Sequence, residues 1–423
     1  MPPRPPHEPT PTFASAQRLL DDAAKFSPPL GCGTCPDFGE CGGLHIEAGL
    51  FDCAGFCNCA DPAACDMVCR NRAQDFFHRF QEVGGFDLAT TPRAPALPVP
   101  ALPEVVPLID HKYSRKAALP EKVVAISLYK LFSKSDGAPL VRTRVELAER
   151  FLIDEDATLV VTGVDRDAKL EAWWAFEDRE RLLATLRDLK VALVSGPNFS
   201  LFTDTPRPDN LHSMKRIALS WAELMAGGVP AALHLNARTD QDYRRWGKFI
   251  AERDEVTVVA FEFGTGAGYE GRIDWHVDRL CALAERVDRP LTLVLRGGVP
   301  ALARLRARFA QVILIETDAF ARTLKRRRAE IAADGRLRWS RITTEKGAPL
   351  DELLAHNIAT RRAFLLGAAP PRSLRLVRGP AKRSAQHADR ETRQRSLVPD
   401  LEMTLQAGAV SANLQDVVVA AKA

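Results

Sequence analysis

The chain has 423 residues and a formal net charge of +4, and its 46% hydrophobic and 26% charged residues are typical of a soluble globular protein of two or three domains. No apolar run reaches the roughly 18 residues that a membrane span requires, and the N-terminus carries prolines where a signal peptide would be apolar. We therefore expect a cytoplasmic protein that does not engage a membrane.

The N-terminal part divides into proline-rich residues 1–30, expected to be disordered, and a cysteine-rich module at residues 31–90. Eight of the nine cysteines fall in this module, spaced C-x2-C-x5-C and then C-x3-C-x-C-x5-C-x3-C. Thiolates this close in a reducing compartment usually hold a metal. We predict two four-cysteine zinc sites, with iron–sulfur clusters and a disulfide framework as the alternatives. The predicted ligands are Cys32, Cys35, Cys41, Cys53, Cys57, Cys59, Cys65 and Cys69.

Residues 91–120, proline-rich at their start, are predicted to be a linker, and residues 121–380 an α/β domain. Short apolar runs alternate there with amphipathic stretches, at a spacing of about thirty residues that favours a (β/α)8-type barrel. Strands are expected at Val123–Ser127, Thr158–Thr162, Val191–Ser195, Ala231–Leu235, Val256–Phe261, Leu291–Leu295, Val312–Ile315 and Leu374–Val377. A doubly wound parallel sheet is the alternative, because strand order is not visible in a sequence.

Polar side chains follow these strands, at the end where a barrel carries its active site. Glu262 lies in an apolar run, where an ionised carboxylate is costly unless a partner or substrate satisfies it. Asp204 has no evident capping role, whereas Asp209 suits a helix cap as well as catalysis. With Asn198 these residues are the catalytic candidates. The candidate substrate-binding residues are Arg207, His212, Lys215, Arg216, His234, Asn236, Arg238 and Arg296, among which His234 is equally consistent with a core histidine.

The C-terminal part is strongly basic, with 23 Lys/Arg and 9 Asp/Glu between Arg296 and Arg395. It includes the run Lys325, Arg326, Arg327 and Arg328, and residues 381–423 form a basic tail. Clustered positive charge of this kind suits a phosphate backbone, so we predict a nucleic-acid partner and assign phosphate binding to that run.

A family resemblance is carried by Gly163 to Phe320, which contains Pro197-Asn198-Phe199-Ser200-Leu201 and Asp204-x-Pro206. This part, a third to a half of the chain, resembles a family of bacterial and phage-borne proteins of unassigned function, and the phage association suggests antiviral defence or a mobile element. More loosely, a barrel with strand-end carboxylates, a thiolate metal site and a basic surface is similar to the tRNA-guanine transglycosylase class. In that class the metal site follows the barrel strands, whereas here the cysteines precede them.

Together these features predict an enzyme that acts on a nucleic-acid base or its N-glycosidic bond, a glycosylase or transglycosylase-like hydrolase. Asp204 or Glu262 would be its carboxylate, and Asn198, His234 and Asn236 would read the base edge. One alternative is an iron–sulfur enzyme with a small organic substrate. The other is a non-catalytic, zinc-dependent nucleic-acid-binding protein.

Overall fold

Eight short strands of apolar, largely β-branched residues form one parallel sheet in the computed structural model, which describes residues 79–111, 114–201, 207–264, 266–268, 272–343 and 347–367. The strands are β1 (Val105–Pro107), β2 (Val123–Ser127), β3 (Thr158–Thr162), β4 (Val191–Ser195), β5 (Ala231–His234), β6 (Val258–Glu262), β7 (Thr292–Arg296) and β8 (Gln311–Glu316). Their order in the sheet is β1-β8-β7-β6-β5-β4-β3-β2. Chain order is thus kept around the sheet, with β1 beside β8.

The sheet is a nearly closed barrel. Its two outermost strands meet at a parallel bridge between Leu108 and Ala125, and the Ile109 amide donates to the Ala125 carbonyl over 2.9 Å. A doubly wound sheet would instead reverse its strand order at a switch point. The α/β class and the parallel, barrel-like sheet predicted from the sequence are therefore confirmed, whereas the cysteine-rich module lies outside the described residues.

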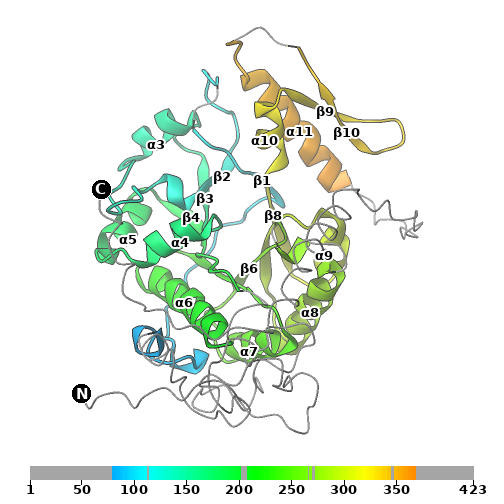
Figure 1. The fold of residues 1–423 in the computed structure, drawn as a ribbon. Coiled ribbons are helices and arrows are strands. Elements are labelled where there is room, and N and C mark those ends of the chain that lie inside the picture. The colour runs from blue at the N-terminus through cyan, green and yellow to red at the C-terminus, as the bar shows by residue number, and fades with distance from the viewer. Residues whose placement is uncertain are drawn as a thin grey trace, which may run out of the picture. The chain divides into compact units, whose positions relative to one another are not determined.

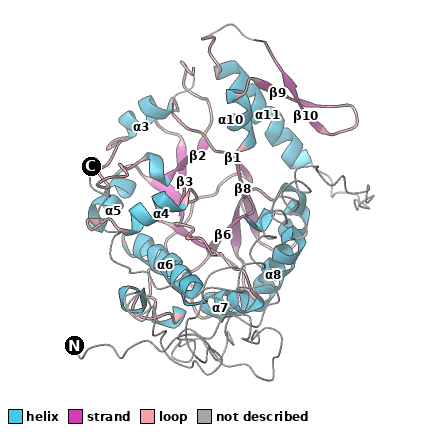
Figure 2. Ribbon diagram, in the orientation of Figure 1, coloured by secondary structure: helices cyan, strands magenta, loops and turns pink. Residues whose placement is uncertain are grey.

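Helices cover the outside of the barrel (Figures 1 and 2). They are α3 (Arg144–Phe151), α4 (Asp167–Trp174), α5 (Arg179–Asp188), α6 (Arg207–Ala226), α7 (Asp240–Ala251), α8 (Arg272–Val287), α9 (Leu302–Arg306), α10 (Asp318–Leu324) and α11 (Asp351–Gly367). Single 3-10 turns lie at η8 (Leu88–Thr90), η9 (Leu128–Lys130), η10 (Gly266–Gly268) and η11 (Val299–Ala301), and β9 (Arg327–Ile331) and β10 (Leu337–Arg341) form a separate antiparallel hairpin. Thr239 and Asp242 illustrate how sequence starts a helix, because they form the capping box of α7.

The first strand differs from the sequence-based expectation. β1 lies within residues 91–120, which the sequence predicts to be a linker, so the barrel begins at Val105 rather than at residue 121. Only two β-branched residues, between Pro103 and Pro107, mark this strand, and prolines so close usually indicate an extended connection. The expected strand Leu374–Val377 lies outside the described residues.

Apolar side chains fill the barrel and the layer between sheet and helices. Val160, Leu193, Ala232, Ala260 and Val294 belong to the interior cluster, one from each of five successive strands. Leu102, which precedes β1, joins that cluster, and its carbonyl accepts from the Gln311 side chain over 2.7 Å at the start of β8. The end of the barrel where the strands begin is therefore filled, and the opposite end is left for polar groups.

The segment that we call the strap, residues 83–102, runs along the outside of α6 and α7 before entering the barrel. Phe86 packs against Leu211 in the first turns of α6. Further along the strap, Arg253, just after α7, donates to the carbonyls of Thr91 and Pro92. Because α6 begins beyond the C-terminal end of β4 and Arg253 lies just before β6, the strap connects the two ends of the barrel.

Candidate active site at the mouth of the barrel

Polar residues occupy the inward-facing positions at the C-terminal ends of the strands. Alternate residues of a strand share a face. On each of β3 to β7, the residue two positions after the member of the apolar interior cluster therefore also points inward. These residues are Thr162, Ser195, His234, Glu262 and Arg296. Active sites of (β/α)8 barrels lie at this end. We therefore take this layer as the candidate site and call it the mouth.

Glu262 is the most perturbed carboxyl group of the mouth. It is 5% exposed, and burial raises its pKa from 4.5 to about 7 against the opposing effects of Arg296 and the Gly264 amide. That amide donates to Oε1 over 2.5 Å. Oε2 has no hydrogen bond within the described part of the chain and lies 3.6 Å from Nε of Arg296. A carboxyl group of this kind carries a proton over part of the neutral range and can give or take one.

Glycines make room for this arrangement. A Cβ on residue 264 would lie 2.3 Å from Oε1 of Glu262, so a side chain there would displace the carboxylate. Gly297, with φ +76°, backs onto the same loop, and a Cβ there would lie 2.9 Å from the Gly264 nitrogen. These glycines are needed for the close approach that brings the amide to Glu262.

A second carboxylate, Asp165, lies within the electrostatic influence of Arg296. The guanidinium donates from Nη1 to the Val164 carbonyl over 3.0 Å. Lys169 donates to Oδ2 of Asp165 over 2.7 Å, and the Ser127 hydroxyl lies 3.4 Å from the same oxygen. Burial alone would raise the pKa of Asp165, but the hydrogen bonds from Lys169 and the Arg166 amide and the charges of Lys169 and Arg296 hold it below its usual range. Asp165 is therefore ionised under conditions in which Glu262 can be protonated.

Further hydrogen-bonding groups, most of them neutral, lie at and just beyond the ends of β4 and β5. His234 is 2% exposed, and burial, assisted by the charge of Arg296, lowers its pKa to about 3. Its imidazole is therefore neutral near pH 7, and Nδ1 has no hydrogen bond among the described residues. Asn236 donates to the Asn198 side chain over 3.0 Å and to the Phe199 carbonyl over 2.9 Å, and Arg238 donates to the Leu201 carbonyl over 2.9 Å.

The catalytic candidate Asp209 and the substrate-binding candidates on α6 contact the N-terminal segment and α4 rather than the mouth. Asp209 forms an ion pair with Arg79. His212 Nε2 lies 2.6 Å from Glu82, and burial and Arg216 lower its pKa to about 4 despite that carboxylate. Arg216 pairs with Glu171 at 2.6 Å and stacks over Phe199.

Lys215 is 0% exposed. It donates to the Asp87 carbonyl over 2.6 Å and to the Thr90 hydroxyl over 2.7 Å. These polar groups of α6 thus hold the strap and α4. Asp204 and the side chain of Arg207 lie outside the described residues.

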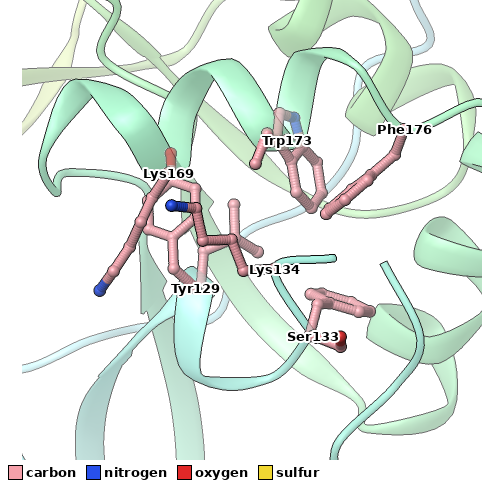
Figure 3. A pocket seen from close by; sticks show the side chains of 9 residues that line it. Tyr129, Ser133, Lys134, Lys169, Trp173 and Phe176 are labelled. Atoms are coloured by element: carbon pink, nitrogen blue, oxygen red, sulfur yellow. The ribbon is translucent and has the colours of Figure 1, made fainter. Parts of the chain in front are cut away.

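An aromatic pocket adjoins the mouth (Figure 3). Its walls come from η9 and the residues that follow it and from α4, with Tyr129, Phe132, Trp173 and Phe176 as the aromatic side chains. Tyr129 donates to the Gly163 carbonyl over 3.0 Å at the end of β3, and Lys169 contributes to the pocket as well as to the pair with Asp165. The pocket is therefore linked to the end of β3 through Tyr129 and to Asp165 through Lys169.

Sequence reasoning did not select Asp165, Lys169 or Gly264 as site residues. The signal for the first two was available, since Asp165 lies three residues after the end of a predicted strand and Lys169 lies four residues later, the spacing of neighbours on a helix. Gly264 was visible only as part of a glycine-rich turn, and its contact with Glu262 depends on the folded backbone.

The predicted metal ligands all lie outside the described residues. Within residues 79–367, as far as the structure describes them, no group of three or more His, Cys, Asp or Glu side chains is arranged to hold a metal ion. The zinc prediction therefore concerns the cysteine-rich module alone.

Elemental analysis of the intact protein is expected to find about two zinc ions per chain, because eight thiolates complete two tetrahedral sites. The protein should be colourless, since zinc has a filled d shell. Iron with acid-labile sulfide in the same preparation would overturn the zinc assignment in favour of iron–sulfur clusters.

No helix of the described residues is both long and apolar enough to cross a membrane. The resemblances stated for Gly163 to Phe320 and for the barrel architecture remain predictions. Compared with known proteins, the chain matches no protein-family model and no curated protein.

Proposed function

We propose that the barrel is an enzyme that cleaves or exchanges an N-glycosidic bond, with its chemistry at the mouth. The observation that carries this proposal is the pair of carboxyl groups beside Arg296, whose pKa values are shifted in opposite directions, Glu262 upward and Asp165 downward. General-acid cleavage of a glycosidic bond typically uses two carboxyl groups. One is protonated and acts as the acid, and the other is ionised.

Each side chain has a role in such a reaction. Protonated Glu262 donates its proton to the leaving base nitrogen as the bond to the sugar C1′ breaks. Ionised Asp165 stabilises the positive charge that develops on the sugar. Water then adds to C1′ and returns a proton to the Glu262 carboxylate, or a second base adds in an exchange reaction.

The substrate is proposed to be a nucleoside unit of a nucleic acid. Neutral His234 and the Asn198–Asn236 amide pair supply both donors and acceptors, as reading a base edge requires. Arg296 would hold Glu262 and the Val164 carbonyl in place while a base is bound. A role in antiviral defence or in a mobile element is part of the same proposal and rests on the family resemblance alone.

The test is release of free base from nucleosides and from single- and double-stranded oligonucleotides, measured by chromatography. Asp165→Asn is expected to reduce release by about 10²–10⁴-fold, because it removes the charge that stabilises the sugar cation. Asp188→Asn, at the exposed end of α5, is the matched control and should retain full release. Equal rates in wild type and Asp165→Asn, or no release by wild type from any of these substrates, would contradict the proposal.

A further inference from the structure

The β9–β10 hairpin is a separate element attached to the barrel. It is connected to α10 on one side and α11 on the other, and among the described residues its strands pair only with each other. Figure 1 shows the hairpin extending away from the barrel beside α10 and α11. We propose that this hairpin is a docking element for double-stranded nucleic acid. The proposal is independent of the chemistry at the mouth.

Charge of one sign dominates the hairpin. Residues 325–341 contain seven Lys/Arg against two acidic residues, Glu330 and Asp334. The basic residues are Lys325, Arg326, Arg327, Arg328, Arg336, Arg338 and Arg341. Arg336, Arg338 and Arg341 are exposed, and the ion pair of Arg338 with Asp334 is itself exposed, so water weakens it. The hairpin therefore presents a surface of strong positive potential.

One pair of like charges lies across the two strands, whereas Arg338 lies opposite Glu330. Arg327 lies directly opposite Arg341 in the register, an arrangement that destabilises a strand pair. Neither guanidinium forms an ion pair with a described carboxylate. An anion bound between or beside Arg327 and Arg341 would reduce this repulsion. We therefore expect the hairpin to be more stable with an anionic partner than without one.

Side-chain contacts hold the hairpin against α10 and α11. The Asn357 side chain on α11 accepts from the Ala329 amide and donates to the Arg327 carbonyl, each over 2.8 Å. Nε2 of His356 lies 2.9 Å from the Ala329 carbonyl, and Arg322 on α10 stacks over Trp339. A fixed presentation lowers the entropic cost of binding.

A two-stranded ribbon of this kind fits a nucleic-acid duplex. Paired strands lie about 4.8 Å apart, and the major groove of B-form DNA, about 12 Å wide, admits such a ribbon. Charged side chains, lysine in particular, also protect exposed strand edges from pairing with other chains, whereas every basic residue within these two strands is an arginine. The excess of positive charge is what points to phosphates.

The test measures binding of the full chain to a fluorescein-labelled DNA duplex by anisotropy at several salt concentrations. The triple variant Arg336→Gln, Arg338→Gln, Arg341→Gln is expected to bind at least about tenfold more weakly at low salt. The plot of log binding constant against log salt concentration should also become less steep, its slope decreasing in magnitude by about 2–3, or about one for each lost phosphate contact. The matched control removes three exposed arginines from other places, Arg142→Gln, Arg181→Gln and Arg244→Gln, and should keep the wild-type slope.

Three outcomes would overturn the proposal. The first is no binding of duplex by wild type at low salt. The second is an equal loss in the two triple variants, which would mean that overall charge and not the hairpin attracts DNA. The third is tighter binding of a single strand of the same length than of the duplex, because the ribbon-in-groove geometry requires a groove. Circular dichroism of each variant shows whether it is folded.

Discussion

Replacing Glu262 with glutamine is expected to make the protein more stable above pH 7, although it removes the central group of the mouth. The folded carboxyl group keeps its proton up to a pKa of about 7, whereas an unfolded one ionises near 4.5. The wild type therefore loses stability as the pH rises from about 4.5 to 7, and the loss persists above that range. Glutamine has no charge to bury. The shift corresponds to about 3 kcal/mol, at 1.36 kcal/mol for each pKa unit.

The measurement is urea unfolding of both proteins at pH 5 and pH 8. The stability of Glu262→Gln relative to wild type should be greater at pH 8 than at pH 5, by up to about 3 kcal/mol. Glu255→Gln is the control, because Glu255 is also buried but pairs with Arg253 and Arg93 near the other end of the barrel. It should be destabilised at both pH values. An identical difference between Glu262→Gln and wild type at pH 5 and pH 8 would show that Glu262 does not titrate across this interval.

The same substitution is expected to reduce base release by about 10²–10⁴-fold if the proposed reaction is correct, since amides do not donate a proton as acids do. A gain in stability together with a loss of activity is typical of residues whose burial serves function at the expense of folding. Stability is measured without substrate, so the two results are independent. A stabilised variant with undiminished base release would refute the catalytic role of Glu262, while still confirming that its carboxyl group has a raised pKa in the folded protein.

Much of the barrel was predictable because buried parallel strands are continuous apolar runs. β2, β3 and β4 have the same bounds as predicted, and β5 to β8 differ by one or two residues at their ends. β1 was missed because its position is decided by pairing with β8 and by the bridge to Ala125, not by local composition. Closure of a barrel is a tertiary property, and a strand of three residues between prolines carries little signal of its own.

The sequence pattern predicts Glu262 and Arg296 at strand ends, but it does not show that the two side chains are neighbours. Glu262 lies opposite Arg296 in the register of β6 and β7, and that register follows from the packing of two strands whose paired residues are 34 positions apart. For Lys215, the prediction of substrate binding is not supported by its position in the fold. A lysine near a predicted strand end was a reasonable phosphate ligand, yet it is buried because the strap, more than a hundred residues earlier in the chain, lies over it.

Replacing Lys215 with methionine is therefore expected to destabilise the protein by about 3 kcal/mol. Methionine keeps the apolar stem but leaves the Asp87 carbonyl and the Thr90 hydroxyl without the ammonium that they contact. Hydrogen bonds to a buried charge are each worth about 1.5–3 kcal/mol, and the substitution removes two of them. Because these acceptors belong to the strap, residues 83–102 should also become more sensitive to limited proteolysis.

Lys122→Met provides the control, because Lys122 is exposed and its loss should change stability by less than about 0.5 kcal/mol. The substitutions also decide between the two roles considered for Lys215. A structural lysine predicts lower stability and easier cleavage of the strap, with unchanged base release per folded molecule. A substrate-binding lysine predicts normal stability and a raised KM, and that result would mean that Lys215 leaves the strap when substrate binds.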